Sequence, residues 1–331
     1  MDYDTIIQLT VEKLPELFGD GLKVSEIHGG GSDRHYFRIG NDFLKLIFCR
    51  YGVEKKENSL FADHSDFLGE HGVRVPRVLA QDQENRCLWV EDLGGEDLWS
   101  YRDSDWISVR RPLYQAALLE VGKLHSVTER LISHLPVLNP PFNVDLYRWE
   151  FEYFMDNFVN RLSAATIDEI RPVRESAELK HLRLELSAQP RCLVHRDLQS
   201  QNVLIWKGMP ALIDFQGMRY GLPEYDVASL IFDPYVVMSK EEREDLIRFL
   251  ESRSNNADFR GQLLRCAVQR LMQVLGAYGF LGLVKKKSAF LKFIPRGLEN
   301  LHHVAVEQGV MPVLEPMLSL RDDRFLKVLI S

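Results

Sequence analysis

Residues 195–202 read His195-Arg196-Asp197-Leu198-Gln199-Ser200-Gln201-Asn202, and residues 213–215 read Ile213-Asp214-Phe215. The residues between them predict two apolar strands, Val203 to Trp206 and Ala211 to Phe215, joined by a turn at Lys207-Gly208-Met209-Pro210. If Trp206 pairs with Ala211, Asp214 falls opposite Val203 and next to Asn202. We therefore expect a β-hairpin that brings an amide and a carboxylate to the same end of the ribbon.

These side chains carry the oxygen atoms that a divalent cation needs. Asn202 and Asp214 can both bind Mg²⁺ through oxygen, the donor that this ion prefers. Asp197 remains as a carboxylate that can orient an attacking hydroxyl and accept its proton. This combination is typical of a phosphoryl-transfer site. Each residue alone is also common in turns and at strand ends, so the prediction depends on the whole pattern.

The composition is that of an ordinary globular protein. The chain has 331 residues, of which 45% are hydrophobic and 27% charged, enough for one large domain or two lobes. Its net charge of -7 argues against a protein that binds nucleic acid or anionic membranes over a broad surface.

The cysteines and the apolar segments favour a cytoplasmic protein. Cys49, Cys87, Cys192 and Cys266 form no C-x-x-C pair and are interpreted as reduced thiols. The first residues lack the basic and apolar regions of a signal peptide. The apolar run Leu271 to Val284 is shorter than a membrane-spanning helix requires, so we expect a buried core helix.

The order of predicted elements favours an α+β fold with two unequal lobes. Strands are expected at 23–28, 35–39, 42–48, 75–80 and 86–91, with helices at 5–18 and 57–69. Helices dominate afterwards, at 112–127, 146–162, 167–186, 240–252, 262–278 and 292–307. We place a small β-rich lobe at residues 1–93 and a larger helical lobe at 94–331.

The first lobe contains residues suited to a nucleotide. The turn Gly29-Gly30-Gly31-Ser32 lies between two predicted strands, where backbone N–H groups can approach phosphate oxygens, although a plain turn also needs glycine. Lys45 lies within an apolar strand and is predicted to contact the phosphates, with Glu57 or, as second choice, Glu54 orienting it. The alternative is an edge-strand lysine that faces solvent.

The segment Glu91-Asp92-Leu93-Gly94 follows an apolar strand and is expected to connect the lobes. Clefts between lobes are common ligand sites. An extended connector could offer the Glu91 carbonyl and the Leu93 N–H group to an adenine edge, and the alternative is an ordinary strand end.

The order of motifs in this chain resembles that of the aminoglycoside phosphotransferase-type kinases, which share the protein-kinase-like fold. The motifs are the glycine turn, the strand lysine, the helix glutamate, the E-D-L-G connector, the H-x-D-x4-N motif and the I-D-F motif. The resemblance implies a bilobal fold, Asp197 as catalytic base, Asn202 and Asp214 as magnesium ligands, and ATP as phosphoryl donor. It also implies that Lys45 binds phosphates, that Glu91 and Leu93 meet adenine, and that His195 and Asp226 support the catalytic loop. Asp226 is equally suited to cap a helix.

Longer strings are most similar to the branch that contains bacterial cell-wall amino-sugar kinases. They are Ser32 to Arg38, His195 to Asn202, Ile213 to Gly217, Tyr225 to Leu230 and Gln269 to Gly276. That branch implies phosphorylation of the anomeric hydroxyl of N-acetylmuramate or N-acetylglucosamine, a small-molecule acceptor. True aminoglycoside enzymes usually carry glycine where this chain has Arg196.

Two other functions stay open. One is a kinase for another small alcohol, such as an aminoglycoside, choline or homoserine, and the other is a non-catalytic nucleotide-binding pseudokinase. Arg219 and Glu150 are candidate sugar-binding residues, although charged residues of this kind more often form a solvated, salt-bridged face.

Overall fold

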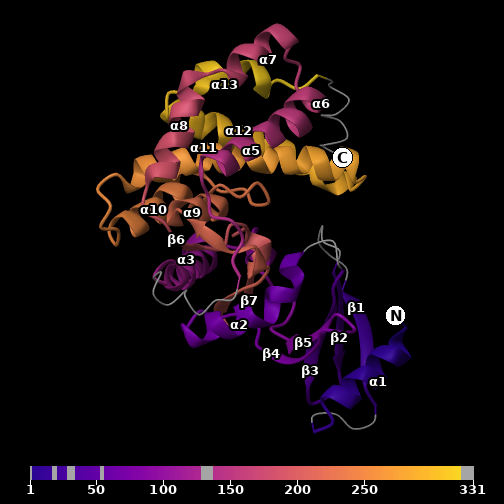
Figure 1. Ribbon diagram of the computed structural model, residues 1–331. Coiled ribbons are helices and arrows are strands. Elements are labelled where there is room, and N and C mark those ends of the chain that lie inside the picture. The colour runs from indigo at the N-terminus through magenta and orange to yellow at the C-terminus, as the bar shows by residue number, and fades with distance from the viewer. Residues whose placement is uncertain (1, 17–20, 28–33, 53–55, 128–136, 322–331) are drawn as a thin grey trace.

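The computed structural model describes residues 2–16, 21–27, 34–52, 56–127 and 137–321. It has a β-sheet at one end and a larger mass of helices at the other, as Figure 1 shows. The expected bilobal α+β fold is therefore confirmed. The last strand of the sheet ends at Glu91 and helical segments follow from Leu98, while the division between residues 93 and 94 stays a prediction.

The N-terminal part is a five-stranded antiparallel sheet in the order β1-β2-β3-β5-β4. The strands are β1 (Lys23–Ile27), β2 (His35–Gly40), β3 (Lys45–Arg50), β4 (Val78–Asp82) and β5 (Cys87–Glu91). Strands that follow one another in the sequence are joined by short connections, except between β3 and β4, where the chain leaves the sheet to form η1 (Lys56–Leu60) and helix α2 (Phe61–Glu70).

Side chains point alternately to the two sides of each strand, so the sheet has two different faces. One face packs on helix α1 (Tyr3–Lys13) through a cluster that includes Ile6, Phe37, Leu46 and Phe48. The opposite face carries Cys49, Leu88 and Val90, which pack with Ala62 of α2. Both faces of the sheet are therefore covered by apolar contacts, and the sheet can act as a rigid support for the segments at its edges.

Helices build the rest of the chain. They are α3 (Arg111–His125), α5 (Val144–Phe154), α6 (Asn160–Leu162), α7 (Ile167–Arg174), α8 (Ala177–Ala188), α9 (Pro223–Ile231), α10 (Lys240–Glu251), α11 (Phe259–Gly279), α12 (Ile294–Glu307) and α13 (Met311–Leu318). Shorter turns flank them at Leu98–Tyr101, Trp106–Arg110, Met155–Val159, Phe280–Val284 and Ser288–Phe293. The helix expected at 167–186 is interrupted, because α7 ends at Arg174 and α8 begins at Ala177.

Helix α11 forms the centre of this helical part and packs against α5, α9 and α12. With the turn that follows, Phe259–Val284 is the one helical run in the described ranges that is long and apolar enough to cross a membrane. Because 67% of its most apolar window is buried inside the protein, it has the surroundings of a core helix, as the sequence predicted.

A β-hairpin lies between the sheet and the helices and consists of β7 (Val203–Trp206) and β8 (Met209–Leu212). The predicted register was wrong, because Trp206 pairs with Met209 and not with Ala211. The turn contains only Lys207 and Gly208, with φ angles of 52° and 75°. Positive φ at both central positions is typical of a type I′ turn, whose twist matches that of the strands.

Candidate active site

The catalytic-loop candidate begins where strand β6 (Cys192–Val194) ends. Arg196 has a φ of 77°, so the backbone turns sharply just before Asp197. The buried carboxylate of Asp226 in α9 accepts hydrogen bonds from the backbone N–H of His195 at 2.7 Å and of Arg196 at 2.8 Å. His125 of α3 contacts the same carboxylate at 2.9 Å. These bonds hold the turn in place, and the role of Asp226 in supporting a catalytic loop stays a prediction.

His195 ties the loop to the hairpin. Its side chain is buried, and its Nε2 atom lies 2.8 Å from the carbonyl oxygen of Ile213, the residue before Asp214. The Asn202 carbonyl in turn accepts the N–H of Ile213 at 3.0 Å. Asn202 and Asp214 therefore lie at the same end of the hairpin, although the register differs from the predicted one.

Asn202 has an orientation suited to a cation. Its amide Nδ2 donates to the Asp197 carbonyl at 2.8 Å, which leaves the amide oxygen as the acceptor at the other side of the group. Across the described ranges, no cluster of three or more His, Cys, Asp or Glu side chains could hold a metal by itself. An amide and a carboxylate oxygen fit Mg²⁺, which commonly takes one or two protein carboxylates together with substrate phosphates.

Asp214 lies just beyond strand β8, with a left-handed backbone at φ 63°. Its Oδ1 atom accepts hydrogen bonds from Gln216 at 2.7 Å and from Arg34. Burial opposes ionisation of the carboxyl, but the Arg34 charge and these hydrogen bonds outweigh it, so the pKa of Asp214 lies below its ordinary value. Asp214 is thus held as an anion, the form that a metal needs.

Asp197 is paired with an arginine that sequence reasoning did not assign a role. Arg270 of α11 donates from Nη2 to Asp197 Oδ1 and from Nε to Ser229 at 3.0 Å. The Arg270 side chain is 5% exposed, whereas that of Asp197 is 43% exposed. The sequence feature that could have indicated this role is an arginine within the apolar helix α11, because a buried guanidinium requires a partner.

The structure places Lys45 near the connector, beside the candidate residue Glu91. Lys45 is exposed, begins β3 and pairs with Gly40, whereas its neighbour Leu46 pairs with Glu91 beside the connector. It lines an open depression of about 340 Å³ together with Asp92, Gly94 and Trp206. Lys45 therefore lies at the connector end of the sheet, and not in the middle of a strand as the sequence predicted.

Other nucleotide candidates are described only in part. Gly29, Gly30, Gly31 and Ser32 lie outside the described residues, as do Glu54 and the side chain of Glu57. Arg38 links β2 to the connector by donating to both oxygens of Asp92 at 2.6 and 3.0 Å. Glu91 and Leu93 flank this point, and their contacts with adenine remain a prediction.

The two candidate sugar-binding residues lie in the interior. Glu150 is 2% exposed and accepts from Tyr225 at 2.8 Å and from Gln269 at 3.0 Å. Arg219 is 6% exposed and packs over the ring of Phe142 at 5.5 Å. These surroundings favour structural roles for both.

An arginine and an aromatic stack lie near the catalytic loop instead. The rings of Trp149 and Tyr153 stack with centroids 5.1 Å apart, and Trp149 is 51% exposed. Burial raises the pKa of Tyr153 to about 12, although the nearby charge of Arg196 acts against this rise. Among the described residues the Arg196 guanidinium forms no hydrogen bond or ion pair, although its charge favours ionisation of the buried Glu150 carboxyl.

Comparison with known proteins decides the family. The profile of the phosphotransferase enzyme family matches residues 23–260, which include both the sheet and the catalytic-loop hairpin. The chain belongs to this family. The members of this family are described as phosphotransferase enzymes.

Relatives of this phosphotransferase include two kinases for amino sugars. The N-acetylmuramate/N-acetylglucosamine kinase of Pseudomonas aeruginosa is 28% identical over 67% of this chain and 65% of its own length. The enzyme of the same name from Pseudomonas putida is 29% identical over 69% of this chain and 68% of its own length. The chain thus spans about two thirds of the length of the relatives it matches.

Solved structures support the fold. A choline/ethanolamine kinase family protein from Mesorhizobium loti superposes with a TM-score of 0.61 and 17% identity over 98% of both chains. At this level of identity the likeness concerns the fold alone.

Proposed function

We propose that this phosphotransferase uses Mg²⁺ and ATP to phosphorylate a hydroxyl of an amino sugar, with the anomeric hydroxyl of N-acetylmuramate or N-acetylglucosamine as preferred acceptor. The main support is that Asp197, Asn202 and Asp214 come together on one loop and hairpin. The names of the relatives support the choice of acceptor. A cytoplasmic location is part of this proposal.

Asp197 is the residue that would orient the acceptor hydroxyl and take its proton. Arg270 holds one carboxylate oxygen, and within the described ranges the other oxygen has no hydrogen-bond donor. The carboxylate is thus fixed in direction while one oxygen stays available to the acceptor.

Asn202 and Asp214 would hold the metal, which offsets negative charge on the phosphates when it is bound. The hairpin keeps these residues at a fixed position relative to Asp197, because Asn202 bonds both the Asp197 carbonyl and Ile213. In phosphoryl transfer, the main contribution of the protein is to position the phosphoryl donor and the acceptor hydroxyl.

The charge near the acceptor side favours a sugar over a cationic alcohol. Arg196 directly precedes Asp197 and is half-buried, and within the described residues its guanidinium forms no hydrogen bond or ion pair, although its charge acts on the buried carboxyl of Glu150. Choline and aminoglycosides carry positive charge and would be repelled there, whereas a neutral or anionic amino sugar would not. The aromatic stack at Trp149 and Tyr153 offers an apolar surface of the kind that suits a sugar ring.

The acceptor is tested by incubating the protein with Mg-ATP and a panel of amino sugars, small alcohols and aminoglycosides, with phosphorus NMR to detect products. A sugar 1-phosphate is the expected product. Turnover of choline or an aminoglycoside alone would contradict the proposal, and nucleotide binding without any product would favour a pseudokinase.

The base is tested with Asp197→Asn. We expect kcat to fall by about 10²- to 10⁴-fold while nucleotide binding is retained, because the amide cannot accept the proton. Asp168→Asn makes the same chemical change at a side chain that is 90% exposed and serves as the control. Near-normal turnover by the Asp197 variant would show that the base is assigned wrongly.

A further inference from the structure

The sheet register shows which of two basic residues lies near Asp214, the proposed metal ligand. Tyr36 pairs with Cys49 and Gly40 pairs with Lys45, so the start of β2 and the end of β3 lie together. Lys45 lies at the other end of this strand pair. If this register is extended, Arg34 lies opposite Tyr51. Tyr51 follows Lys45 by six residues, so Arg34 and Lys45 are separated along the strands by about 20 Å at the rise of a strand.

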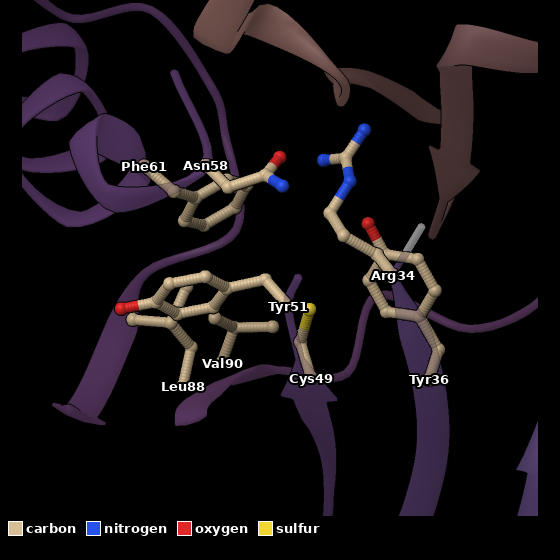
Figure 2. A pocket seen from close by; sticks show the side chains of 8 residues that line it. All are labelled: Arg34, Tyr36, Cys49, Tyr51, Asn58, Phe61, Leu88 and Val90. Carbon is tan, nitrogen blue, oxygen red and sulfur yellow. The ribbon is translucent and has the colours of Figure 1, made fainter. Parts of the chain in front are cut away.

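Arg34 and Lys45 share the same face of the sheet. Side chains alternate along β2 and β3, and the pairing places Arg34 and Tyr36 on the face that carries Cys49 and Lys45. Only the position along the strands separates the two cations. Figure 2 shows the Arg34 guanidinium beyond the Tyr36 ring, directed toward Asn58.

The contacts of Arg34 leave donors available in a buried group. Its side chain is 7% exposed and forms an ion pair with Asp214 Oδ1. A guanidinium has five N–H donors, and within the described residues the buried Nε atom of Arg34 has no partner. The adjoining cavity measures about 20 Å³, which has room for about one water molecule and not for a ligand.

We infer that Arg34, and not Lys45, is the cation that binds the phosphate tail of the nucleotide. This inference depends on the proposed function, because it names a residue of the same nucleotide site. In this structure Arg34 forms an ion pair with Asp214. When nucleotide and metal bind, Arg34 donates to phosphate oxygens, a geometry that its planar fork matches, and Asp214 becomes free for the metal.

Nucleotide binding without acceptor tests the assignment. Calorimetry would compare Mg-ADP with adenosine for the unaltered protein, for Arg34→Gln, and for Lys45→Gln, which removes the same charge from the opposite end of the same face. We expect Arg34→Gln to weaken Mg-ADP binding about ten- to hundredfold with adenosine binding unchanged. Lys45→Gln should leave both nearly unchanged, and Arg34→Lys should recover part of the loss.

The ion pair between Arg34 and Asp214 makes a second, independent prediction. Mn²⁺ alone, followed by electron paramagnetic resonance, should bind more tightly to Arg34→Gln than to the unaltered protein, because Arg34 no longer competes for Asp214. A merely structural arginine would give equal or weaker Mn²⁺ binding in the variant, and that result would overturn the inference.

Two further outcomes separate this inference from the proposed function. Loss of Mg-ADP binding in Lys45→Gln, with normal binding in Arg34→Gln, would overturn the assignment of Arg34 and leave the kinase proposal intact. Normal nucleotide results with no sugar phosphorylated would instead overturn the proposed acceptor and support the assignment of Arg34. If the unaltered protein bound no nucleotide, both would be wrong.

Discussion

At the scale of single residues, the two carboxylates of the site are each bonded to an arginine that is distant in the sequence. Arg270 follows Asp197 by 73 residues, and Arg34 precedes Asp214 by 180 residues. Asp197 and Asp214 were proposed as site residues from their local motif, whereas neither arginine partner could be derived from it. Long-range ion pairs depend on how the elements pack, and a single sequence contains no direct signal for that packing.

The assignment of Lys45 shows how a small boundary error changes a site. A strand predicted at 42–48 places Lys45 in its middle, but β3 begins at Lys45 because Asn41 accepts the N–H groups of Phe43 and Leu44 at 2.9 Å and prolongs the turn. The predicted position of Lys45 along the strand was therefore wrong, and that position decides which end of the sheet its side chain reaches.

Arg270 is expected to position Asp197 through a fork that a lysine cannot replace. In Arg270→Lys, one ammonium group cannot reproduce the bonds to Asp197, Ser229 and Gln273 together. We expect kcat to fall with little change in the KM for nucleotide, measured by steady-state kinetics at saturating acceptor. An unchanged kcat would contradict this role.

Arg196 is expected to select against cationic acceptors. Its φ of 77° is a conformation that glycine adopts without strain, so Arg196→Gly should not weaken the fold through its backbone. We expect the ratio of kcat/KM for a cationic acceptor to that for N-acetylglucosamine to rise. The control is Arg86→Gly, which changes an arginine of φ 56° in the turn between β4 and β5. An equal ratio in both variants would rule out this selection.

At the scale of secondary-structure elements, the catalytic hairpin was predicted as an element but with the wrong register. Pro210 was placed in the turn, yet it pairs with Ile205 inside the ribbon. The N–H of Ile205 points outward to the Glu96 carbonyl at 2.8 Å, so this is a pair without ladder bonds. The missing N–H of Pro210 therefore costs no hydrogen bond, and a proline at this position is tolerated.

The type I′ turn gives a prediction about stability. In Gly208→Ala, the φ of 75° strains the backbone while the added methyl group meets no atom within 4 Å. We expect the free energy of unfolding to fall by about 1 kcal/mol, measured by urea denaturation. Gly122→Ala in α3 is the control, because it also meets no atom within 4 Å and should raise stability by up to about 1 kcal/mol. A rise for both variants would show that the turn is not strained.

At the scale of the whole molecule, the fold class was predictable because strand and helix patterns are local and change near residue 93. The reduced cysteines were also expected, and all four are free. How the helices close on the catalytic loop was not predictable. Asp233, which follows α9, illustrates this, since it bonds both the N–H and the hydroxyl of Ser200, at 2.8 and 2.6 Å.

Asp233 should make global stability depend on pH. Burial raises the pKa of Asp233 from its ordinary value of 3.8 to about 6. The hydrogen bonds from Ser200 and Tyr235 and the charge of Arg270 lower this pKa, but burial outweighs them. Between these values the folded protein binds more protons than the unfolded chain, so this group's contribution to stability falls as pH rises. The loss amounts to about 3 kcal/mol above pH 6.

The variant Asp233→Asn tests this dependence because its amide oxygen can still accept from Ser200 and does not titrate. Relative to the unaltered protein, its free energy of unfolding should increase between pH 4 and pH 7, measured in urea. The comparison between the two proteins removes the contribution of other carboxyl groups. A difference that stays constant over this range would contradict the raised pKa of Asp233.

The segment that follows Asp214 has a consequence for control of the enzyme. Residues Phe215–Gly217 form a 3-10 turn, and Arg219–Gly221 form strand β9, which pairs with β6 directly before the catalytic loop. The segment between Asp214 and α9 is thus short and consists mostly of regular backbone. It contains no long loop that another enzyme could modify, so we expect the reaction rate to depend on the concentrations of nucleotide and acceptor and not on covalent modification of this segment.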